Sequence, residues 1–293
     1  MINRNGKIED AVPFLKWAGG KRQLLPELAR HVPAGFSHYC EPFLGGGALL
    51  FHLQPERALV NDINAELINV YEVIRDDADG LIAELKKHRN NEKYYYRIRK
   101  WDRTSGYGKL SPVQRASRII YLNRTCYNGL FRVNSKGHFN VPFGRYRNPG
   151  IVNEKTLRAV SAYLNKSEID FECGDFLDLE KKIKRGTFVY VDPPYHPVSK
   201  TSSFTSYADH GFAEADQVRL KEFCERLVAD KNCYVLISNS YTGFIRKLYS
   251  GPGFEIRKIN AVRSINSVGS MRGKIPEALI TGRQKRRRKS ICS

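Results

Sequence analysis

The chain has 293 residues, of which 41% are hydrophobic, and a formal net charge of +19. This length accommodates one large domain, or a core domain with an insertion. The excess of positive charge predicts a polyanionic partner. A membrane surface is a poor candidate, because the sequence has no run of eighteen apolar residues and no signal-peptide pattern at its start.

The six cysteines are scattered along the chain, and none forms a CxxC pair or has a metal-ligand spacing with histidine. We therefore expect reduced cysteines, a cytoplasmic protein and no metal site.

The first candidate site is at residues 13–22, where the sequence is PFLKWAGGKR. An Ala-Gly-Gly run lets the backbone approach a ligand closely. Trp17 adds a flat face and Lys21 adds positive charge. The alternative is a turn that enters a helix at residues 23–31, with Trp17 in the core.

Residues 38–47 predict a strand, a turn of three glycines and the start of a helix. In Rossmann-like folds the first turn has this arrangement, and helix-end amides face the ligand. The spacing is not GxGxxG, so a dinucleotide is not expected. The next strand, residues 58–61, ends at Asp62, where doubly wound folds hold ribose hydroxyls. The alternative for Asp62 is an acid at the start of the helix that Asn64 caps.

Residues 86–150 contain sixteen Lys or Arg and two acids, so this segment carries most of the net charge. Basic side chains that hold phosphates and aromatic rings that stack on bases are typical of a nucleic-acid surface. The alternative, a solvated basic face, would usually alternate in sign. The interleaved aromatic residues are Tyr94, Tyr95, Tyr96, Trp101, Tyr107, Tyr121, Tyr127, Phe131, Phe139, Phe143 and Tyr146.

Within this segment, residues 121–142 predict a β-hairpin with its turn at residues 134–137. A two-stranded ribbon fits a major groove, where Arg132 could pair bidentately with a guanine. Tyr127 and Leu130 are candidate wedges or stacking groups. The alternative is an ordinary structural hairpin.

Two later strands also end at an acid. Residues 169–173 predict a strand, after which Asp175 could accept from the amino group of an adenine and Phe176 could pack on its ring. The alternative is a capping acid and a core ring. Residues 188–191 form an apolar run that predicts a buried strand ending at Asp192.

The corner after this strand combines Asp192, Pro193, Pro194 and Tyr195. The prolines fix φ and remove two N–H donors, so the turn is stiff. One acceptor side chain, rigid carbonyls and an aromatic ring suit an amino group on a planar ring, such as the exocyclic amine of a nucleobase. The alternative is a solvent turn after a strand.

The rest of the chain predicts a helix at residues 212–230 and a strand at residues 233–237. Residues 254–259 and 278–281 could close the sheet as a hairpin. The basic block that begins at Arg283 is expected to be a disordered tail, which could add nonspecific phosphate affinity.

Five motifs in this order resemble the Dam-type DNA N6-adenine methyltransferases, in which cofactor motifs precede an inserted target-recognition segment and Asp-Pro-Pro-Tyr follows it. The matching segments are residues 14–21, 41–47, 127–132, 139–146 and 192–195. Five motifs in the order of the family are a much more specific signal than any one of them.

The resemblance implies an α/β fold, namely a Rossmann-like S-adenosylmethionine-dependent methyltransferase sheet with an inserted, mainly helical target-recognition domain that carries the β-hairpin. Residues 1–76 and 151–282 would be the two parts of the catalytic domain. Residues 77–150 would be the recognition domain, and residues 283–293 the tail.

The resemblance also implies transfer of a methyl group from S-adenosylmethionine to N6 of adenine in duplex DNA, within GATC and by base flipping. Arg132 matches the arginine that reads guanine in the family. The catalytic residues would be Asp192, Pro193, Pro194 and Tyr195. The cofactor-binding residues would be Trp17, Ala18, Gly19, Gly20, Lys21, Glu41, Pro42, Phe43, Gly45, Gly46, Gly47, Asp62, Asp175, Phe176 and Asp192. The DNA-binding residues would be Arg124, Tyr127, Asn128, Leu130, Arg132, Asn134, Lys136 and Arg145.

Three other functions remain open on the sequence. A DNA cytosine-N4 methyltransferase would use the same amine chemistry. An RNA or protein amine methyltransferase would share the core but not the long basic insert. The third alternative is a DNA-binding protein with an inactive cofactor site, against which the intact glycine turn, Asp62 and Asp192 argue. Double-stranded DNA is the expected partner, with a cognate restriction endonuclease acting on the same site as a further candidate.

Overall fold

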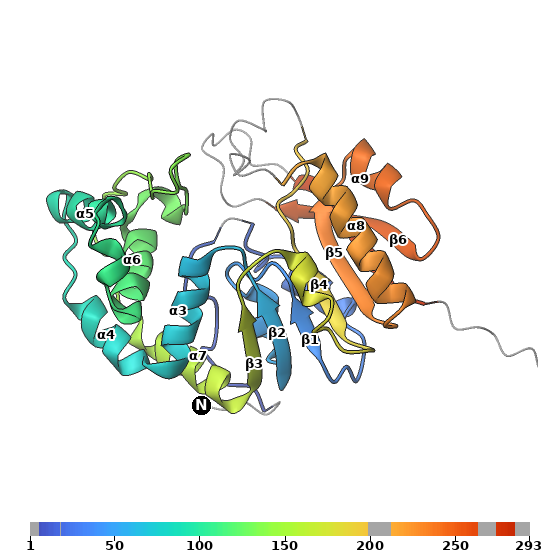
Figure 1. Cartoon of the computed structure of the whole chain (residues 1–293), viewed down its shortest axis with the longest axis horizontal. Coiled ribbons are helices and arrows are strands. Elements are labelled where there is room, and N and C mark those ends of the chain that lie inside the picture. The colour runs from blue at the N-terminus through green and yellow to red at the C-terminus, as the bar shows by residue number, and fades with distance from the viewer. Residues whose placement is uncertain (1–5, 18, 199–211, 263–273, 285–293) are drawn as a thin grey trace, which may run out of the picture. The chain divides into compact units, whose positions relative to one another are not determined.

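The computed structural model contains both helices and strands and describes residues 6–17, 19–198, 212–262 and 274–284. Ala18 and most of the expected tail lie outside the described residues. The described part is a mixed α/β fold with seven strands, so the expected fold class is confirmed at this level (Figure 1).

The chain divides into two compact units, and each contains two separate stretches of sequence. The first unit is Met1–Pro26 with Phe43–Phe176, and the second is Glu27–Pro42 with Leu177–Ser293. The basic segment expected to be a recognition domain therefore lies in the same unit as most of the expected cofactor motifs.

The first unit contains one pair of parallel strands. Strand β2 (Arg57–Asn61) pairs with β3 (Glu168–Glu172), in register from Arg57 opposite Glu168 to Asn61 opposite Glu172. The unit also contains the helices α2 (Ala48–Leu53), α3 (Ala65–Asp76), α4 (Ala78–Lys86), α5 (Glu92–Arg99), α6 (Pro112–Thr125) and α7 (Glu154–Lys166), and the short 3-10 helices η1 (Lys100–Arg103), η2 (Tyr107–Lys109) and η3 (Tyr127–Gly129).

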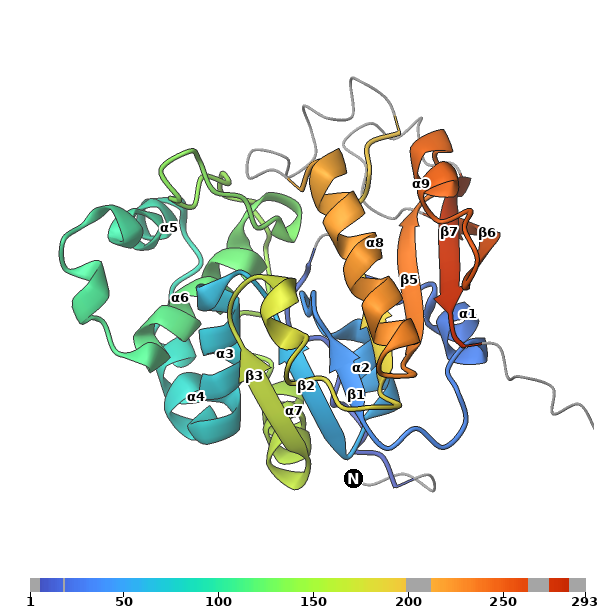
Figure 2. The same ribbon diagram turned by 45° about the vertical axis from the view of Figure 1, so that its right-hand side comes forward.

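Local sequence explains where these helices begin. The side chain of Asn64 accepts from the amides of Glu66 and Leu67 and caps α3, as predicted. Ser111 and Gln114 form a reciprocal capping box at the start of α6. Helix α6 packs against α3, α4 and α5, and these helices lie together in Figure 2.

The aromatic residues of the basic segment mostly form a core. Tyr95, Tyr121 and Phe139 are buried in one hydrophobic cluster, and most of the others pack against it. Of the eleven, Tyr127 is the one classed as exposed, at 46%. Most of these rings therefore contribute to the packing of the segment, because a helical segment of this size must bury apolar area of its own.

The predicted β-hairpin does not form two strands in the described residues 121–142. Its turn exists, since the amide of Gly137 donates to the carbonyl of Asn134 at 2.8 Å. The arms are joined there by one isolated bridge, Val133 opposite Phe139. Two backbone hydrogen bonds flank this bridge, from the amide of Asn134 to the carbonyl of His138 at 2.8 Å and from the amide of Asn140 to the carbonyl of Arg132 at 3.0 Å.

The second unit contains the other five strands. The strands β1 (Tyr39–Glu41), β4 (Phe188–Val191) and β5 (Tyr234–Ser240) are parallel neighbours in that order. β7 (Lys274–Gly282) pairs antiparallel with β5 on one side and with β6 (Phe254–Val262) on the other, which confirms the predicted closing hairpin. The helices here are α8 (Glu214–Ala229) and α9 (Gly243–Leu248), while α1 (Leu25–Arg30) and the 3-10 helix η4 (Phe176–Leu179) span unit boundaries.

Candidate functional site

Asp62 lies directly after β2 and accepts hydrogen bonds from two backbone amides. Its Oδ2 accepts from Gly45 at 2.9 Å, and its Oδ1 accepts from Asn64 at 3.0 Å. Burial raises the pKa of Asp62, and these two hydrogen bonds oppose that rise. The carboxylate is thus fixed beside the glycine turn, where its remaining lone pairs can accept from ribose hydroxyls.

Ile63, the next residue, was not singled out by the sequence analysis. Its side chain is 80% exposed, the largest exposure among the described large hydrophobic residues that are classed as exposed. The available signal was an apolar residue between Asp62 and Asn64 at a strand end. Its position makes it a candidate contact for a flat ring.

The ring of Trp17 determines the shape of the glycine turn. Gly45 has φ 49°, and a Cβ there would lie 2.8 Å from Cδ1 of Trp17. A Cβ on Gly46 would lie 3.2 Å from Cβ of Trp17. The half-buried indole also stacks on Phe131, with ring centroids 5.1 Å apart. The turn therefore requires glycine because an indole of the same chain lies against it.

Helix α6 holds the first motif in place. The side-chain amide of Asn123 donates from Nδ2 to the carbonyl of Lys16 at 2.7 Å, and its Oδ1 accepts from the backbone amide of Lys16 at 2.9 Å. Arg124, an expected DNA contact, donates to the carbonyl of Phe14 at 2.7 Å. Burial, followed by the charge of Arg22, lowers the pKa of Arg124. Arg124 thus has a structural contact, and Asn123 is a supporting residue that sequence reasoning missed.

Lys21 is buried, and its ammonium group donates to the carbonyl of Gly19 at 2.6 Å. This contact closes the glycine-containing turn on itself. A buried lysine thus lies next to two exposed glycines, whose backbone a ligand can approach closely.

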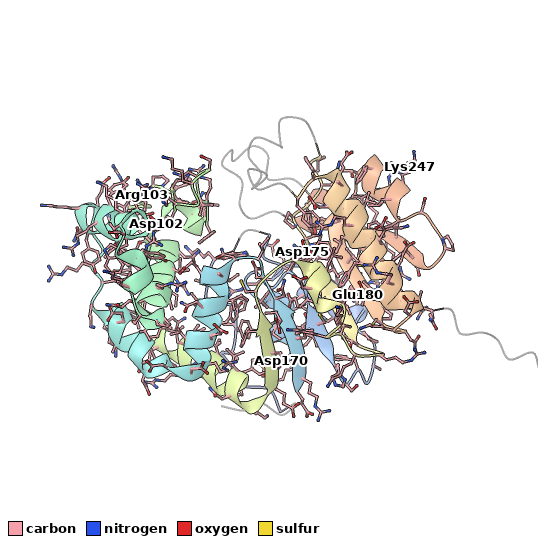
Figure 3. All side chains as sticks on the ribbon, viewed as in Figure 1. Asp102, Arg103, Asp170, Asp175, Glu180 and Lys247 are labelled. Atoms are coloured by element: carbon pink, nitrogen blue, oxygen red, sulfur yellow. The ribbon has the colours of Figure 1, made fainter. Side chains whose placement is uncertain are left out.

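The expected adenine contacts after β3 differ in exposure. Phe176 is buried and its ring packs on Phe43, with centroids 5.4 Å apart. Asn61 donates to the carbonyl of Gly174 at 3.1 Å and so fixes the start of this segment. Asp175 is partly exposed and is labelled in Figure 3. The core-ring interpretation of Phe176 fits this packing, and Asp175 remains a candidate contact.

Glu41 and Pro42 belong to the second unit. Glu41 is buried at the end of β1 and accepts from the hydroxyl of Tyr39 at 2.7 Å. Burial, and then the charge of Glu41, raise the pKa of Tyr39 well above its ordinary value. The tyrosine is therefore a neutral donor to a buried carboxylate.

The corner of residues 192–195 follows β4 at the carboxyl edge of the parallel strands of the second unit. Val191 lies opposite Ile237 of β5. Asp192 is half-buried, Pro193 is buried and Pro194 is exposed. The edge where parallel strands end is where α/β folds bind ligands.

Tyr195 is anchored by a carboxylate from β7. Its hydroxyl donates to Oε2 of Glu277 at 2.8 Å. Burial is the largest cause that raises the pKa of Tyr195 well above its ordinary value, followed by the charges of Asp192 and Glu277. The ring therefore carries a protonated hydroxyl, and its orientation is fixed.

A network of hydrogen bonds at the end of β5 supports the backbone of the corner and of the residue after it. Gln217 of α8 donates to the carbonyl of Pro194 at 2.9 Å and accepts from Asn239 at 3.0 Å. Oδ1 of Asn239 accepts from the amide of His196 at 3.1 Å, and Ser240 donates to the His196 carbonyl at 2.5 Å. These residues were not among the predicted site residues; the available signal was the polar triplet that ends the apolar β5 strand.

The expected DNA-binding residues fall into two groups. Tyr127, Arg132, Lys136 and Arg145 are exposed, and Nε of Arg132 donates to Asn140 at 2.7 Å. The others have structural contacts: Leu130 packs on the hydrophobic cluster, Asn134 accepts from the amides of Lys136 and His138, and the amide of Asn128 donates to Tyr146 at 3.0 Å.

None of the helices in the described ranges is both long enough and apolar enough to cross a membrane.

Comparisons with known proteins identify the family. A family model described as D12 class N6 adenine-specific DNA methyltransferase matches residues 17–265. The chain is 46% identical over 271 residues to "Type II methyltransferase M1.LlaDCHI" of Lactococcus lactis subsp. cremoris, covering 92% of this chain and 94% of that protein. It is 42% identical to "Type II methyltransferase M.MjaIII" of Methanocaldococcus jannaschii, covering 89% of this chain and 94% of that protein. It is 37% identical to "DNA adenine methylase" of Serratia marcescens, covering 91% of this chain and 96% of that protein. The chain therefore belongs to the D12 class of N6 adenine-specific DNA methyltransferases.

Proposed function

We propose that this protein transfers the methyl group of S-adenosylmethionine to N6 of an adenine within GATC in duplex DNA. The observation that carries the proposal is the family match over residues 17–265, because it includes every segment to which the sequence assigns donor or adenine binding. The expected motifs at residues 41–47 and 192–195 both fall within it.

The first unit supplies the residues assigned to the donor. Asp62 accepts from the ribose hydroxyls, Ile63 and Phe43 lie against the adenine moiety, and Asp175 accepts from its amino group. Trp17 and Lys21 line the donor pocket, with Trp17 held by Phe131. The fixed geometry of Asp62, bonded at 2.9 and 3.0 Å to two backbone amides, supports this assignment. The resemblance assigns Glu41 and Pro42 to the donor as well.

The corner of residues 192–195 is assigned to the target adenine. The adenine leaves the base stack, at a cost of about a few kcal/mol that stacking and hydrogen bonds in the pocket offset. Tyr195 stacks on the flipped base, while Asp192 and the Pro193 carbonyl accept from the N6 hydrogens. These acceptors increase electron density on N6 and orient its lone pair.

Chemically, N6 forms a bond to the methyl carbon while the sulfonium–methyl bond breaks and S-adenosylhomocysteine leaves. The methylated amine then loses a proton, which is acidic only at that stage. No strong base is required before the attack. The residues of the corner therefore act by positioning and by accepting hydrogen bonds.

The exposed basic residues of the first unit are assigned to the duplex. Arg132 reads a guanine with its guanidinium, Tyr127 stacks or wedges between bases, and Lys136 and Arg145 contact phosphates. Their exposure supports these assignments. GATC is carried over from the Dam-type resemblance, and a relative named DNA adenine methylase supports adenine as the target.

We also propose that the protein works on cytoplasmic DNA beside a cognate restriction endonuclease that cuts the same site. Two relatives, at 46% and 42% identity, are named type II methyltransferases, which supports a restriction-modification setting. A cell that expresses the endonuclease should survive only when the methyltransferase is active.

The test of the proposed function is incubation with a labelled methyl donor and duplexes that contain GATC or a single-base variant of it. We expect label only in the GATC duplex, and N6-methyladenine as the one modified nucleoside after digestion and mass measurement. N4-methylcytosine would contradict the adenine assignment, and equal labelling of all duplexes would contradict GATC recognition. Absence of donor binding in calorimetry would indicate an inactive cofactor site.

A further inference from the structure

The loop of residues 131–143 carries Arg132, and two backbone hydrogen bonds join its arms, from the amide of Asn134 to the carbonyl of His138 and from the amide of Asn140 to the carbonyl of Arg132. One isolated bridge joins its arms, and a second links Phe143 to Cys126. Two-stranded segments are marginally stable on their own even when they form a regular ladder. The position of Arg132 therefore depends on what holds this loop from outside.

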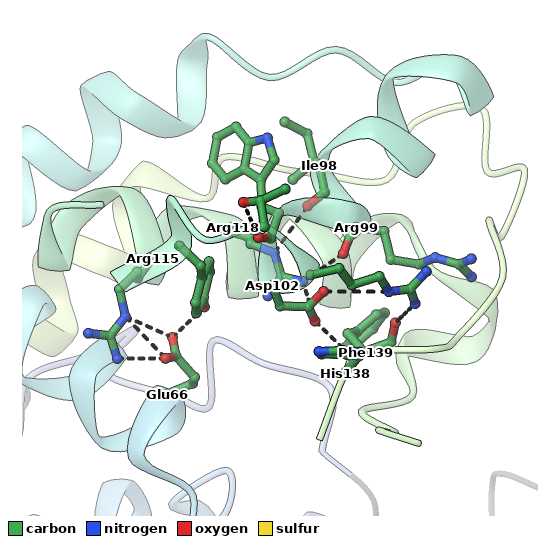
Figure 4. A network of polar contacts seen from close by, with 12 residues as sticks. Glu66, Ile98, Arg99, Asp102, Arg115, Arg118, His138 and Phe139 are labelled. Carbon is green, nitrogen blue, oxygen red and sulfur yellow. Dashed lines mark hydrogen bonds and ion pairs between the residues drawn. The ribbon is translucent and has the colours of Figure 1, made fainter. Parts of the chain in front are cut away.

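Side chains from α5 and η1 hold the returning arm by its backbone. Oδ2 of Asp102 accepts from the amide of Phe139 at 2.7 Å, and Arg103 donates to the carbonyl of the same residue at 2.9 Å (Figure 4). Two residues further on, the hydroxyl of Tyr95 donates to the carbonyl of Val141 at 2.8 Å. Arg99 also donates to the Val141 carbonyl, at 3.1 Å, so four side-chain contacts hold the returning arm from outside.

Asp102 is in turn fixed by a buried arginine. The guanidinium of Arg118 is 2% exposed and lies 2.7 Å from Oδ2 of Asp102. It also donates to the carbonyls of Ile98 and Arg99 at 3.1 and 2.9 Å, at the end of α5 (Figure 4). A buried arginine is tolerated only when it is paired and hydrogen-bonded. Arg118 thus fixes the position of the Asp102 carboxylate, which accepts from the amide of Phe139.

Asn140 transmits this placement to Arg132. The backbone amide of Asn140 donates to the carbonyl of Arg132 at 3.0 Å, and its side-chain Oδ1 accepts from Nε of Arg132 at 2.7 Å. Bidentate pairing with guanine uses the two terminal nitrogens of an arginine, which the Nε contact leaves available. Because Asn140 directly follows Phe139, a shift of Phe139 moves the acceptor that orients the guanidinium.

We propose that Asp102 and Arg118 are positioning residues for base recognition: through Phe139 and Asn140 they fix the direction of Arg132. This inference rests on the proposed function, since it assumes that Arg132 reads a base. A buried ion pair with only a structural role would affect stability and all substrates alike. A positioning role changes the discrimination between substrates.

The experiment measures kcat/KM of the full chain on the duplex it methylates best and on duplexes with one base pair changed at each position. Asp102→Ala should lower the discrimination at one base pair by about tenfold or more, with donor affinity in calorimetry unchanged. The matched control is Asp79→Ala, which removes an Asp–Arg pair of the same 2.7 Å length between exposed side chains. This control should show the same ratios of kcat/KM between the duplexes as the wild type.

Two further variants keep the test decisive if Asp102→Ala does not fold. Asp102→Ala with Arg118→Met removes both charges, so no buried charge is left unpaired. Asn140→Ala changes a partly exposed side chain and tests the last step alone. Reduced discrimination in a folded variant supports the inference. Wild-type discrimination in Asn140→Ala, or in a folded variant of Asp102, overturns it, whereas a wild-type protein without any methyl transfer overturns the proposed function instead.

Discussion

The hydroxyl of Tyr195 donates a 2.8 Å hydrogen bond to the carboxylate of Glu277, so strand β7 fixes the ring of the Asp-Pro-Pro-Tyr corner. The two residues are 82 positions apart in the sequence. A hydrogen bond to a charged acceptor contributes about 1.5–3 kcal/mol. The antiparallel strand next to the parallel set therefore supports the corner structurally as well as extending the sheet.

Replacing Glu277 should reduce turnover through Tyr195. Glu277→Leu leaves the buried hydroxyl without its acceptor, and we expect kcat to fall about 10- to 100-fold. Glu277→Gln keeps an acceptor oxygen and should retain most of the activity. Steady-state kinetics on the preferred duplex measures both, and equal losses in the two variants would indicate a role for the charge alone.

Asp192→Ala should abolish methyl transfer while duplex binding is preserved, because the residue is assigned to N6 and not to the DNA backbone. Asp192→Asn keeps one acceptor oxygen and should retain a small residual rate. Methyl incorporation and a gel-shift titration are the two measurements. Wild-type turnover in Asp192→Ala would remove the residue from the mechanism.

Arg132→Ala should relax discrimination at one guanine, at a cost of about 1–3 kcal/mol there. Lys136→Ala, at the exposed tip of the same loop, should weaken binding to all duplexes alike and reduce its salt dependence. Binding to a set of single-base variants at two salt concentrations separates these outcomes. A uniform loss for Arg132→Ala would mark it as a phosphate contact.

Gly45→Ala should impair donor binding more than its backbone strain explains. Positive φ in a non-glycine residue costs about 1–2 kcal/mol, and the new Cβ would lie 2.8 Å from the Trp17 ring. Gly35→Ala is the control, because it has φ +70° and no atom within 4 Å of its added Cβ. Backbone strain should destabilise both variants in denaturation, with a further loss in Gly45→Ala from the contact with the indole, and only Gly45→Ala should lower donor affinity in calorimetry and alter Trp17 fluorescence. Equal donor affinity in the two would mean that Trp17 is unimportant for the pocket.

His88 should make stability depend on pH. Burial lowers the pKa of His88 from 6.5 to about 4, since its nitrogens contact Tyr94 and Ser117 and its ring stacks on Tyr121 at 4.3 Å. The unfolded chain binds this proton more tightly than the native state does. Stability from neutral His88 is therefore fully present above pH 6.5 and is lost as pH falls toward 4, by up to about 3 kcal/mol.

Urea denaturation of the wild type and of His88→Gln at pH 7 and pH 4.5 tests this linkage. The free energy of unfolding of the variant should be lower than that of the wild type at pH 7, and this difference in free energy should be smaller at pH 4.5. A difference that stays constant with pH would assign the titration to other groups.

Several features of this protein were determined locally by the sequence. The apolar run that ends at Asp192, the Asn64 cap and the strand before Asp62 appear in the structure where the pattern predicts them. Strand runs and caps depend on neighbouring residues, so their signal is contained in a few consecutive positions. The order of motifs likewise sufficed to indicate the family.

The tertiary structure alone decided how these pieces are supported. Nothing near residue 139 indicates that its amide bonds to Asp102, 37 positions away, or that Gln217 supports Pro194. The aromatic residues of the basic segment became a core, since composition records which side chains are present but not which of them face one another. Burial and hydrogen-bond satisfaction are properties of the packed chain, because each is decided by residues that only folding brings together.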